Sequence, residues 1–377
     1  MNTITNNMIN RAIQSKIEAK IGKGKAIIII GPRQVGKTTL IKSIIEKDTY
    51  LFLDGDDPTV RTLLTNPNTE QLKSIIGNNK IVFIDEAQRI QNIGVTLKII
   101  TDQFKEVQLL VSGSSAFELQ NTINEPLTGR KWEYQLLPIS WIEFEENVGF
   151  VKAEQQLEIR LIYGMYPDVI NQTNDAFEVL KELANSYLYK DVLAFSGIRK
   201  PEIIEKLLQA LALQIGSEVN YNELSRLLGI DKNTVSNYID VLEQAFVIFK
   251  LKSFSRNLRN EIKANQKIYF WDTGIRNMVI GNFNGLTLRQ DKGALWENFL
   301  ISERLKKINY GNTLTGSFFW RSIQQQEVDY VEVVADAITG YEIKWNADAK
   351  IKIAKPFKEA YNATINIINR ENFRTFL

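Results

Sequence analysis

The sequence contains no cysteine and no histidine among its 377 residues. The absence of cysteine excludes disulfides, thiolate metal sites and cysteine nucleophiles. The absence of histidine excludes an imidazole general base and zinc sites built on imidazole. Any acid–base chemistry in this protein must therefore be carried out by carboxylates, lysines or water.

Long hydrophobic runs and a large net charge are also missing. No apolar run is long enough to span a bilayer, and no apolar core follows a basic N-terminal stretch. We therefore expect a cytoplasmic protein with no membrane contact. The net charge of +2 is too small to indicate a nucleic-acid partner by itself. The length predicts two or three domains.

The clearest motif follows the apolar run Ala26–Ile30, which predicts a buried strand. Its residues are Gly31, Pro32, Arg33, Gln34, Val35, Gly36, Lys37, Thr38 and Thr39. Between a strand and a helix, G-x-x-x-x-G-K-[ST] predicts a phosphate-binding loop whose backbone N–H groups converge on one point. We therefore expect ATP here, with Lys37 on the β- and γ-phosphates and the Thr38 hydroxyl on Mg²⁺.

A second apolar stretch, Lys80–Ile84, ends in the carboxylates Asp85 and Glu86, which is the Walker B pattern. Asp85, at the C-terminal end of a parallel strand, is expected to hold magnesium directly or through water. Glu86 is expected to orient and polarise the attacking water, because without histidine a carboxylate is the strongest candidate for that role.

Two further residues are candidates for sensing or assisting the nucleotide. Ser114, or alternatively Ser112, follows a buried strand whose end lies beside the γ-phosphate in a P-loop sheet; the alternative role is a helix N-cap before Phe117. Arg130 precedes the strand Lys131–Pro138 and is a candidate arginine finger for a neighbouring subunit, which would imply a homo-oligomer. The alternative for Arg130 is a structural salt bridge.

The N-terminal region and the middle of the chain are predicted to be helical. The spacing of isoleucines predicts a helix over Asn7–Ile21, with Arg11 near the nucleotide base or, alternatively, exposed. Residues 154–210 are expected to form a helical lid. The candidates for a second nucleotide sensor are Lys190, Arg199 and Lys200.

The segment Tyr221–Ile239 predicts a helix–turn–helix, in which Gly229 ends the first helix and Asp231 caps the second. Four residues then face outward at the end of the second helix that meets bases in such motifs: Lys232, Asn233, Ser236 and Asn237. Phe246–Leu251 and Ile268–Trp271 are expected to be wing strands. The stretch between Lys250 and Lys267 carries six basic residues and one acidic residue, which indicates a local patch for DNA phosphates. The alternative is a lid or a protein contact.

The C-terminal region contains a second set of charged residues. A helix carrying Glu297 is followed by strands carrying Asp329 and the pair Glu342 and Lys344. This order resembles the PD-(D/E)-x-K nuclease fold, although Val328 stands where a proline is expected. The resemblance implies that the three carboxylates bind Mg²⁺ while Lys344 steadies the water or the transition state. The alternative is a charged pair on a solvated sheet face.

Several stretches together resemble one family. These are Gly31–Thr39, Ile81–Gln88, Ser112–Ser115, Leu127–Arg130, Gly164–Pro167, Lys267–Gly274 and Trp296–Phe299. They look like the AAA-type ATPases of bacteria and archaea that carry a C-terminal domain of unknown function. The resemblance covers nearly the whole chain and implies an ATPase core and a winged-helix segment, but no substrate.

We therefore predict an α/β protein with four parts: an AAA-type P-loop ATPase domain with a parallel sheet (1–153), a helical lid (154–210), a winged helix (211–284) and a nuclease-like α/β module (285–377). The predicted function is ATP- and Mg²⁺-dependent hydrolysis coupled to action on double-stranded DNA. The alternative is a nucleotide-operated signalling or scaffold switch whose C-terminal domains bind protein and lack nuclease activity.

Overall fold

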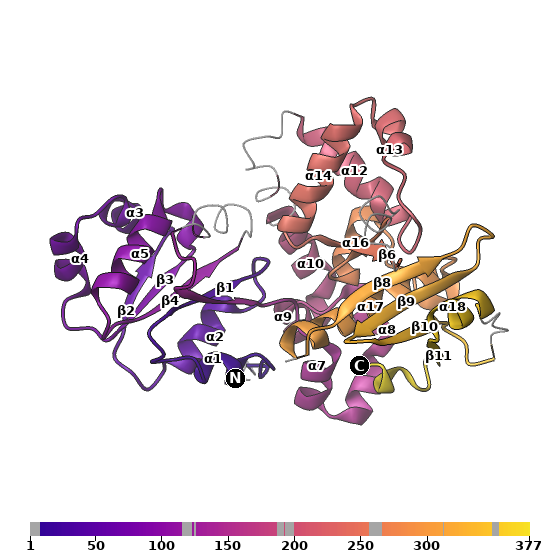
Figure 1. Ribbon diagram of the computed structural model, residues 1–377, viewed down its shortest axis with the longest axis horizontal. Helices are drawn as coiled ribbons and strands as arrows, with labels where there is room; N and C mark the ends of the chain where they lie inside the picture. The colour runs from indigo at the N-terminus through magenta and orange to yellow at the C-terminus, as the bar shows by residue number, and fades with distance from the viewer. Residues whose placement is uncertain are drawn as a thin grey trace. The chain divides into compact units, whose positions relative to one another are not determined.

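The computed structural model describes residues 8–114, 123, 126–186, 192, 200–255, 266–311, 313–348 and 354–377. Contacts between residues divide the chain into two compact units (Figure 1). The first unit is Met1–Pro138 together with Gln244–Phe246, and the second is Ile139–Glu243 together with Val247–Leu377.

The first unit is built on a five-stranded parallel sheet with the strand order β2-β3-β4-β1-β5. The strands are β1 (Ala26–Ile30), β2 (Leu51–Asp54), β3 (Ile81–Asp85), β4 (Gln108–Gly113) and β5 (Lys131–Gln135). Every residue of β1, β3 and β4 is buried, as the apolar runs within these strands predict. The predicted parallel sheet is therefore confirmed.

The helices of the first unit lie around the sheet, and all of them except α1, which precedes β1, lie between its strands in the sequence (Figure 1). They are α1 (Gln14–Glu18), α2 (Lys37–Ile44), α3 (Pro58–Leu64), α4 (Thr69–Ile76), the 3₁₀ turn η1 (Ala87–Arg89) and α5 (Ile93–Gln103). The predicted helix over Asn7–Ile21 is wrong in extent, because the described part of that segment holds only five α-helical residues. Ile9, Ile13 and Ile17 are nevertheless buried, and Ile13, the N-cap residue of α1, provides no side-chain cap. The regular spacing of these isoleucines thus reflects their tertiary packing, and no side-chain cap stabilises a longer helix.

The second unit combines helices with one mixed sheet. Its α-helices are α7 (Trp141–Val148), α8 (Phe150–Tyr163), α9 (Pro167–Asn171), α10 (Ala176–Ala184), α12 (Pro201–Leu213), α13 (Tyr221–Leu228), α14 (Lys232–Gln244), α16 (Thr273–Ile280), α17 (Lys292–Tyr310) and α18 (Lys355–Tyr361). Its 3₁₀ turns are η2 (Thr173–Asp175), η4 (Leu286–Leu288) and η5 (Phe373–Thr375).

The sheet of the second unit has six strands in the order β11-β10-β9-β8-β6-β7. They are β6 (Ile248–Ser253), β7 (Gln266–Phe270), β8 (Gly316–Arg321), β9 (Glu327–Val334), β10 (Ala337–Ile343) and β11 (Thr364–Ile368). The hairpin β6–β7 was expected to be a wing, yet β6 pairs in parallel with β8 through Lys252 and Phe318. Strands predicted for the winged helix and for the C-terminal module therefore share one sheet.

The motifs Gly164–Pro167 and Trp271–Gly274 interlock inside the second unit. The Asp272 carboxylate is buried and accepts hydrogen bonds from the backbone N–H groups of Met165 (2.6 Å) and Ile275 (3.0 Å). Gly164 has φ of 81°, and a Cβ atom there would lie 2.1 Å from Asp272 Oδ1. These two motifs are thus explained by packing and capping.

Within the described ranges, the structure contains no helix that is both long enough and apolar enough to cross a bilayer.

Candidate functional site

The phosphate-binding loop lies between β1 and α2, as the sequence predicts. Gly36 stands at the N-terminus of α2 with φ of 91°, in the region that favours glycine. A Cβ atom on Gly31 would lie 1.9 Å from the backbone oxygen of Leu136. The loop therefore requires glycine at both ends, for backbone conformation at one and for close approach at the other.

Lys37, Thr38 and Asp85 meet at the end of the loop. The Lys37 ammonium is buried and donates hydrogen bonds to the backbone oxygens of Gly31 (2.9 Å) and Pro32 (2.8 Å). The Thr38 hydroxyl donates to Asp85 Oδ2 at 2.6 Å. A hydroxyl and a carboxylate oxygen side by side are ligands that Mg²⁺ prefers, so these residues fit the metal of an ATP complex.

Glu86 belongs to a small hydrogen-bonded network at the same sheet edge. Its carboxylate accepts from Gln88 Nε2 (2.5 Å) and from the Ser114 hydroxyl (3.2 Å). Gln88 Nε2 also donates to Ser114 Oγ at 2.7 Å. Glu86 has φ of 47°, a left-handed backbone unusual for glutamate. The strand-end geometry thus brings the candidate base and the candidate sensor together.

Ser112, the other candidate sensor, contacts the metal-binding carboxylate instead: its hydroxyl donates to Asp85 Oδ1. The alternative cap before Phe117 lies outside the described residues. The sequence predicts no role for Gln88, which is only the last residue of the stretch Ile81–Gln88 that carries the family resemblance. The signal for its role was its position two residues after Glu86, in the turn that follows β3.

Arg11 is buried, so the expectation of an exposed side chain is wrong, while its position near a nucleotide base stays a prediction. The side chain is 8% exposed. Its guanidinium donates to the backbone oxygen of Val35 at 2.8 Å and to that of Leu137 at 2.6 Å. Arg11 therefore joins the phosphate-binding loop to the segment that follows β5.

Arg130 makes the salt bridge that was its alternative role. Its Nε lies 2.7 Å from Asp102 Oδ1, and this hydrogen bond lowers the pKa of Asp102. Arg130 precedes β5, and its backbone oxygen accepts from Ala26 at the start of β1. Because β1 and β5 are parallel, Arg130 lies at the sheet edge opposite the chain's own phosphate-binding loop. Arg130 could therefore act as an arginine finger only on the nucleotide of another subunit, and this role stays a prediction.

The predicted helix–turn–helix has the expected helices α13 and α14. Gly229 takes φ of 65° after α13, and the Asp231 side chain accepts from the N–H of Asn233 at 2.7 Å. Lys232, Asn233 and Asn237 are exposed and Ser236 is half-buried. The outward position of these four side chains agrees with the sequence, while their contact with DNA stays a prediction.

The basic patch predicted between residues 250 and 267 is partly wrong. Lys250 forms ion pairs with Asp240 and Glu243, and Lys267 is 1% exposed and pairs with Glu297 and Glu327. Side chains compensated in this way are not available to phosphates. Of the other four basic residues of the patch, Lys252 is exposed on β6, and Arg256, Arg259 and Lys263 lie outside the described residues. Lys190 and Arg199 also lie outside them, while Lys200 precedes α12.

The C-terminal charged residues meet at the ends of β9 and β10. Lys344 Nζ lies 3.1 Å from Asp329 Oδ2 and 3.5 Å from Glu342 Oε2. Asp329 also accepts from the N–H of Ile343 at 2.7 Å. Burial and the nearby Asp329 raise the pKa of Glu342 to about 7, and Glu342 Oε1 is buried without a hydrogen-bond partner among the described residues.

Glu297 joins this set from α17 by way of Lys267. Glu297 Oε1 lies 3.3 Å from Lys267 Nζ and accepts from the Tyr269 hydroxyl at 2.6 Å. Burial, opposed by Lys267 and reinforced by the Asp329 carboxylate, raises the pKa of Glu297 to about 7. Within the described ranges, no three carboxylates are arranged to hold a metal ion. The predicted Mg²⁺ site therefore does not fit this geometry.

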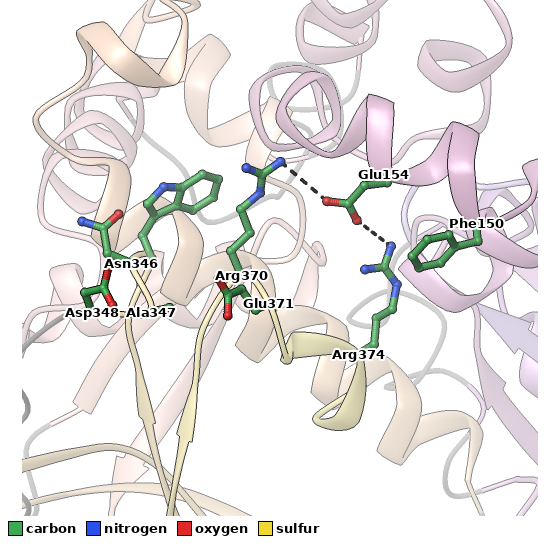
Figure 2. A pocket seen from close by; sticks show the side chains of 9 residues that line it. Phe150, Glu154, Asn346, Ala347, Asp348, Arg370, Glu371 and Arg374 are labelled. Carbon is green, nitrogen blue, oxygen red and sulfur yellow. Dashed lines mark ion pairs between the residues drawn. The ribbon is translucent and has the colours of Figure 1, made fainter.

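A cavity of about 660 Å³ lies beside this region, at the loops after β10 and β11 (Figure 2). Figure 2 shows Arg370 and Arg374 reaching toward Glu154, with distances of 3.6 Å and 2.9 Å. The Arg374 guanidinium also lies 4.5 Å from the centre of the Phe150 ring. No predicted site residue lines this cavity.

Comparison with known protein families assigns three regions of the chain. Residues 23–145 match the family described as AAA domain, and residues 292–373 match Domain of unknown function (DUF4143). Residues 154–285 match Domain of unknown function (DUF8612). Together with the sheet order and the phosphate-binding loop, these matches define a P-loop ATPase-like AAA domain followed by a C-terminal DUF4143 domain.

Two of the similar proteins align with most of this chain. An uncharacterized protein of Mycobacterium tuberculosis is 27% identical over 89% of this chain and 73% of its own length. An uncharacterized protein of Methanocaldococcus jannaschii is 26% identical over 85% of this chain and 75% of its own length. The Walker-type ATPase PABY2304 of Pyrococcus abyssi has a similar fold, with a TM-score of 0.52 and 16% identity over 74% of this chain and 97% of that protein.

Proposed function

We propose that this protein binds ATP with Mg²⁺ at the phosphate-binding loop and hydrolyses it. The observation that carries the proposal is the meeting of Lys37, Thr38, Asp85 and Glu86 at the C-terminal edge of one parallel sheet. The backbone of residues 31–39 is suited to the phosphates, and Thr38 and Asp85 to the metal. The bound metal would neutralise charge on the phosphates.

Glu86 is the proposed base that orients the attacking water. Its carboxylate is held by Gln88 and Ser114, so its direction is fixed before substrate arrives. Ser114 shares this network, and a hydrogen bond from Ser114 to the γ-phosphate would report occupancy to Glu86. Preorganised hydrogen bonds of this kind lower the barrier because they need no rearrangement during the reaction.

The test of the ATPase proposal uses three proteins. The wild type is expected to bind and hydrolyse ATP, Lys37→Ala to lose binding, and Glu86→Gln to bind ATP but hydrolyse it at least a hundredfold more slowly. Binding is measured by nucleotide titration and hydrolysis by phosphate release. ATP binding that is unaffected by Lys37→Ala would contradict the proposal.

We further propose that the nucleotide state controls an interaction of the second unit with double-stranded DNA through the start of α14. The exposure of Lys232, Asn233 and Asn237 at that helix end supports this proposal. The internal pairing of Lys250 and Lys267 favours the second candidate function, a switch whose second unit binds protein.

DNA binding and its salt dependence distinguish the two functions. A DNA contact by Lys232 predicts that Lys232→Ala weakens binding and lowers the slope of log affinity against log salt by about 1. Lys206→Ala, which changes an exposed lysine of α12, is the matched control and is expected to behave as the wild type. An ATPase rate indifferent to DNA at low and moderate salt would favour the protein-binding switch.

We propose homo-oligomer formation only because Arg130 is a candidate arginine finger for another subunit's nucleotide. If Arg130 serves another subunit's nucleotide, Arg130→Ala lowers hydrolysis, and mixing it with Glu86→Gln restores part of the rate, because one mixed interface combines the intact residues. An ATPase rate that is retained on dilution to a proven monomer would contradict a role in trans.

A further inference from the structure

Lys267 lies at the centre of the charged cluster in the second unit. Its side chain is 1% exposed, and its ammonium pairs with Glu297 on α17 and with Glu327 on β9. The ammonium also lies 5.4 Å from the centre of the Phe319 ring on β8. A full positive charge from β7 is therefore held inside the protein by groups from three other elements.

The electrostatics of Lys267 show how strongly this charge is held. Burial alone would lower its pKa, but the carboxylates of Glu297, Glu327 and Asp329 outweigh burial and raise the pKa above its ordinary value. Lys267 therefore stays an ammonium ion throughout the physiological range.

A second lysine completes the compensation. Lys344 contacts both Asp329 and Glu342, so every carboxylate that was predicted to bind Mg²⁺ already lies next to an ammonium group. A divalent cation placed among Glu297, Asp329 and Glu342 would meet two fixed positive charges in a poorly screened interior. Among the described residues, these three carboxylates do not form a group placed to hold one metal ion together.

We propose that Lys267 takes the place of a metal ion in this cluster. Its ion pairs with Glu297 and Glu327 then connect β7 to α17 and β9. The cluster then stabilises the attachment of the β6–β7 hairpin to the sheet and does not support metal-assisted cutting of DNA. This inference is independent of the proposed ATPase activity, because it concerns residues of the second unit alone.

Direct measurement of metal binding tests the proposal. Full-length protein without nucleotide is titrated with Mn²⁺, and the free ion is followed by electron paramagnetic resonance. The wild type and Glu342→Gln are expected to give the same isotherm. If the wild type binds one more Mn²⁺ than Glu342→Gln at submillimolar concentration, the cluster is a metal site and the proposal is overturned.

Stability provides the second test. Lys267→Met leaves buried carboxylates without their counter-ion, so the urea midpoint of the second unit is expected to fall by on the order of 1 M. Adding Glu297→Gln removes one of those carboxylates and is expected to restore at least half of the loss. The proposal fails if Lys267→Met is as stable as the wild type or if the second substitution restores nothing. Should the single variant not fold, the Mn²⁺ comparison and the double variant still decide.

Discussion

The clearest quantitative prediction concerns Arg11. Replacement by methionine keeps a flexible apolar stem of similar length and removes the guanidinium that donates to the backbone oxygens of Val35 and Leu137. A hydrogen bond from a charged group contributes about 1.5–3 kcal/mol, and a buried acceptor left without a donor adds to the loss. Two such bonds amount to about 3–6 kcal/mol, and we expect a destabilisation of about 3 kcal/mol, at the low end of that sum.

A loss of about 3 kcal/mol raises the population of locally opened forms roughly a hundredfold. Hydrogen exchange followed by mass spectrometry is the appropriate assay, because it reads peptides of the first unit separately from the rest of a multi-unit protein. Amides of β1 and of the phosphate-binding loop are expected to exchange roughly a hundredfold faster in Arg11→Met. ATP affinity is expected to fall as well, since the loop is less fixed before binding.

Arg89→Met is the matched control. Arg89 belongs to the same unit and pairs with Asp56 at 3.5 Å, but both side chains are substantially exposed. Such a surface pair contributes less than about 1 kcal/mol. If Arg11→Met and Arg89→Met show the same exchange rates and ATP affinities, the reasoning about Arg11 is refuted.

Three further predictions follow from the structure. Gln88→Ala is expected to lower ATP hydrolysis about tenfold with ATP affinity unchanged, measured by phosphate release and nucleotide titration, because it frees the Glu86 carboxylate. Gly164→Ala is expected to destabilise the second unit in urea unfolding by more than Gly149→Ala, since both glycines have positive φ but only a Cβ at Gly164 meets a buried carboxylate. The pKa of Glu297 is raised from 4.5 to about 7, so the folded protein binds this proton more tightly than the unfolded chain does. Stability measured in urea is therefore expected to fall by up to about 3 kcal/mol as pH rises from about 4.5 to about 7, and to level off above that. Glu297→Gln is expected to flatten that dependence, and an unchanged slope would contradict it.

The features of this protein that could be predicted from sequence are those encoded locally. The apolar run Ala26–Ile30 predicted the buried strand β1, and the spacing of glycine and lysine after it predicted the phosphate-binding loop. The position of Arg11 could not be predicted because its two acceptors are the backbone oxygens of Val35 and Leu137. Every residue has such an oxygen, so the sequence does not indicate these contacts. The helix predicted over Asn7–Ile21 was too long for a related reason, since burial of its isoleucines depends on tertiary packing and does not require a continuous helix.

The second unit shows the limit of motif reading more sharply. The C-terminal pattern consists of one carboxylate, a second carboxylate two residues before a lysine, and a glutamate on a helix. This sequence pattern is the same whether the carboxylates bind a metal ion or pair with a lysine. Only the tertiary structure distinguishes the two cases. Strand β7, which precedes all three carboxylates in the sequence, places Lys267 beside them. A buried ammonium and a divalent cation satisfy the same negative charge, so the presence of one removes the electrostatic reason for the other. The pattern of acidic residues in the C-terminal region therefore identifies an electrostatic site, and only the position of Lys267 indicates which cation the site was built to hold.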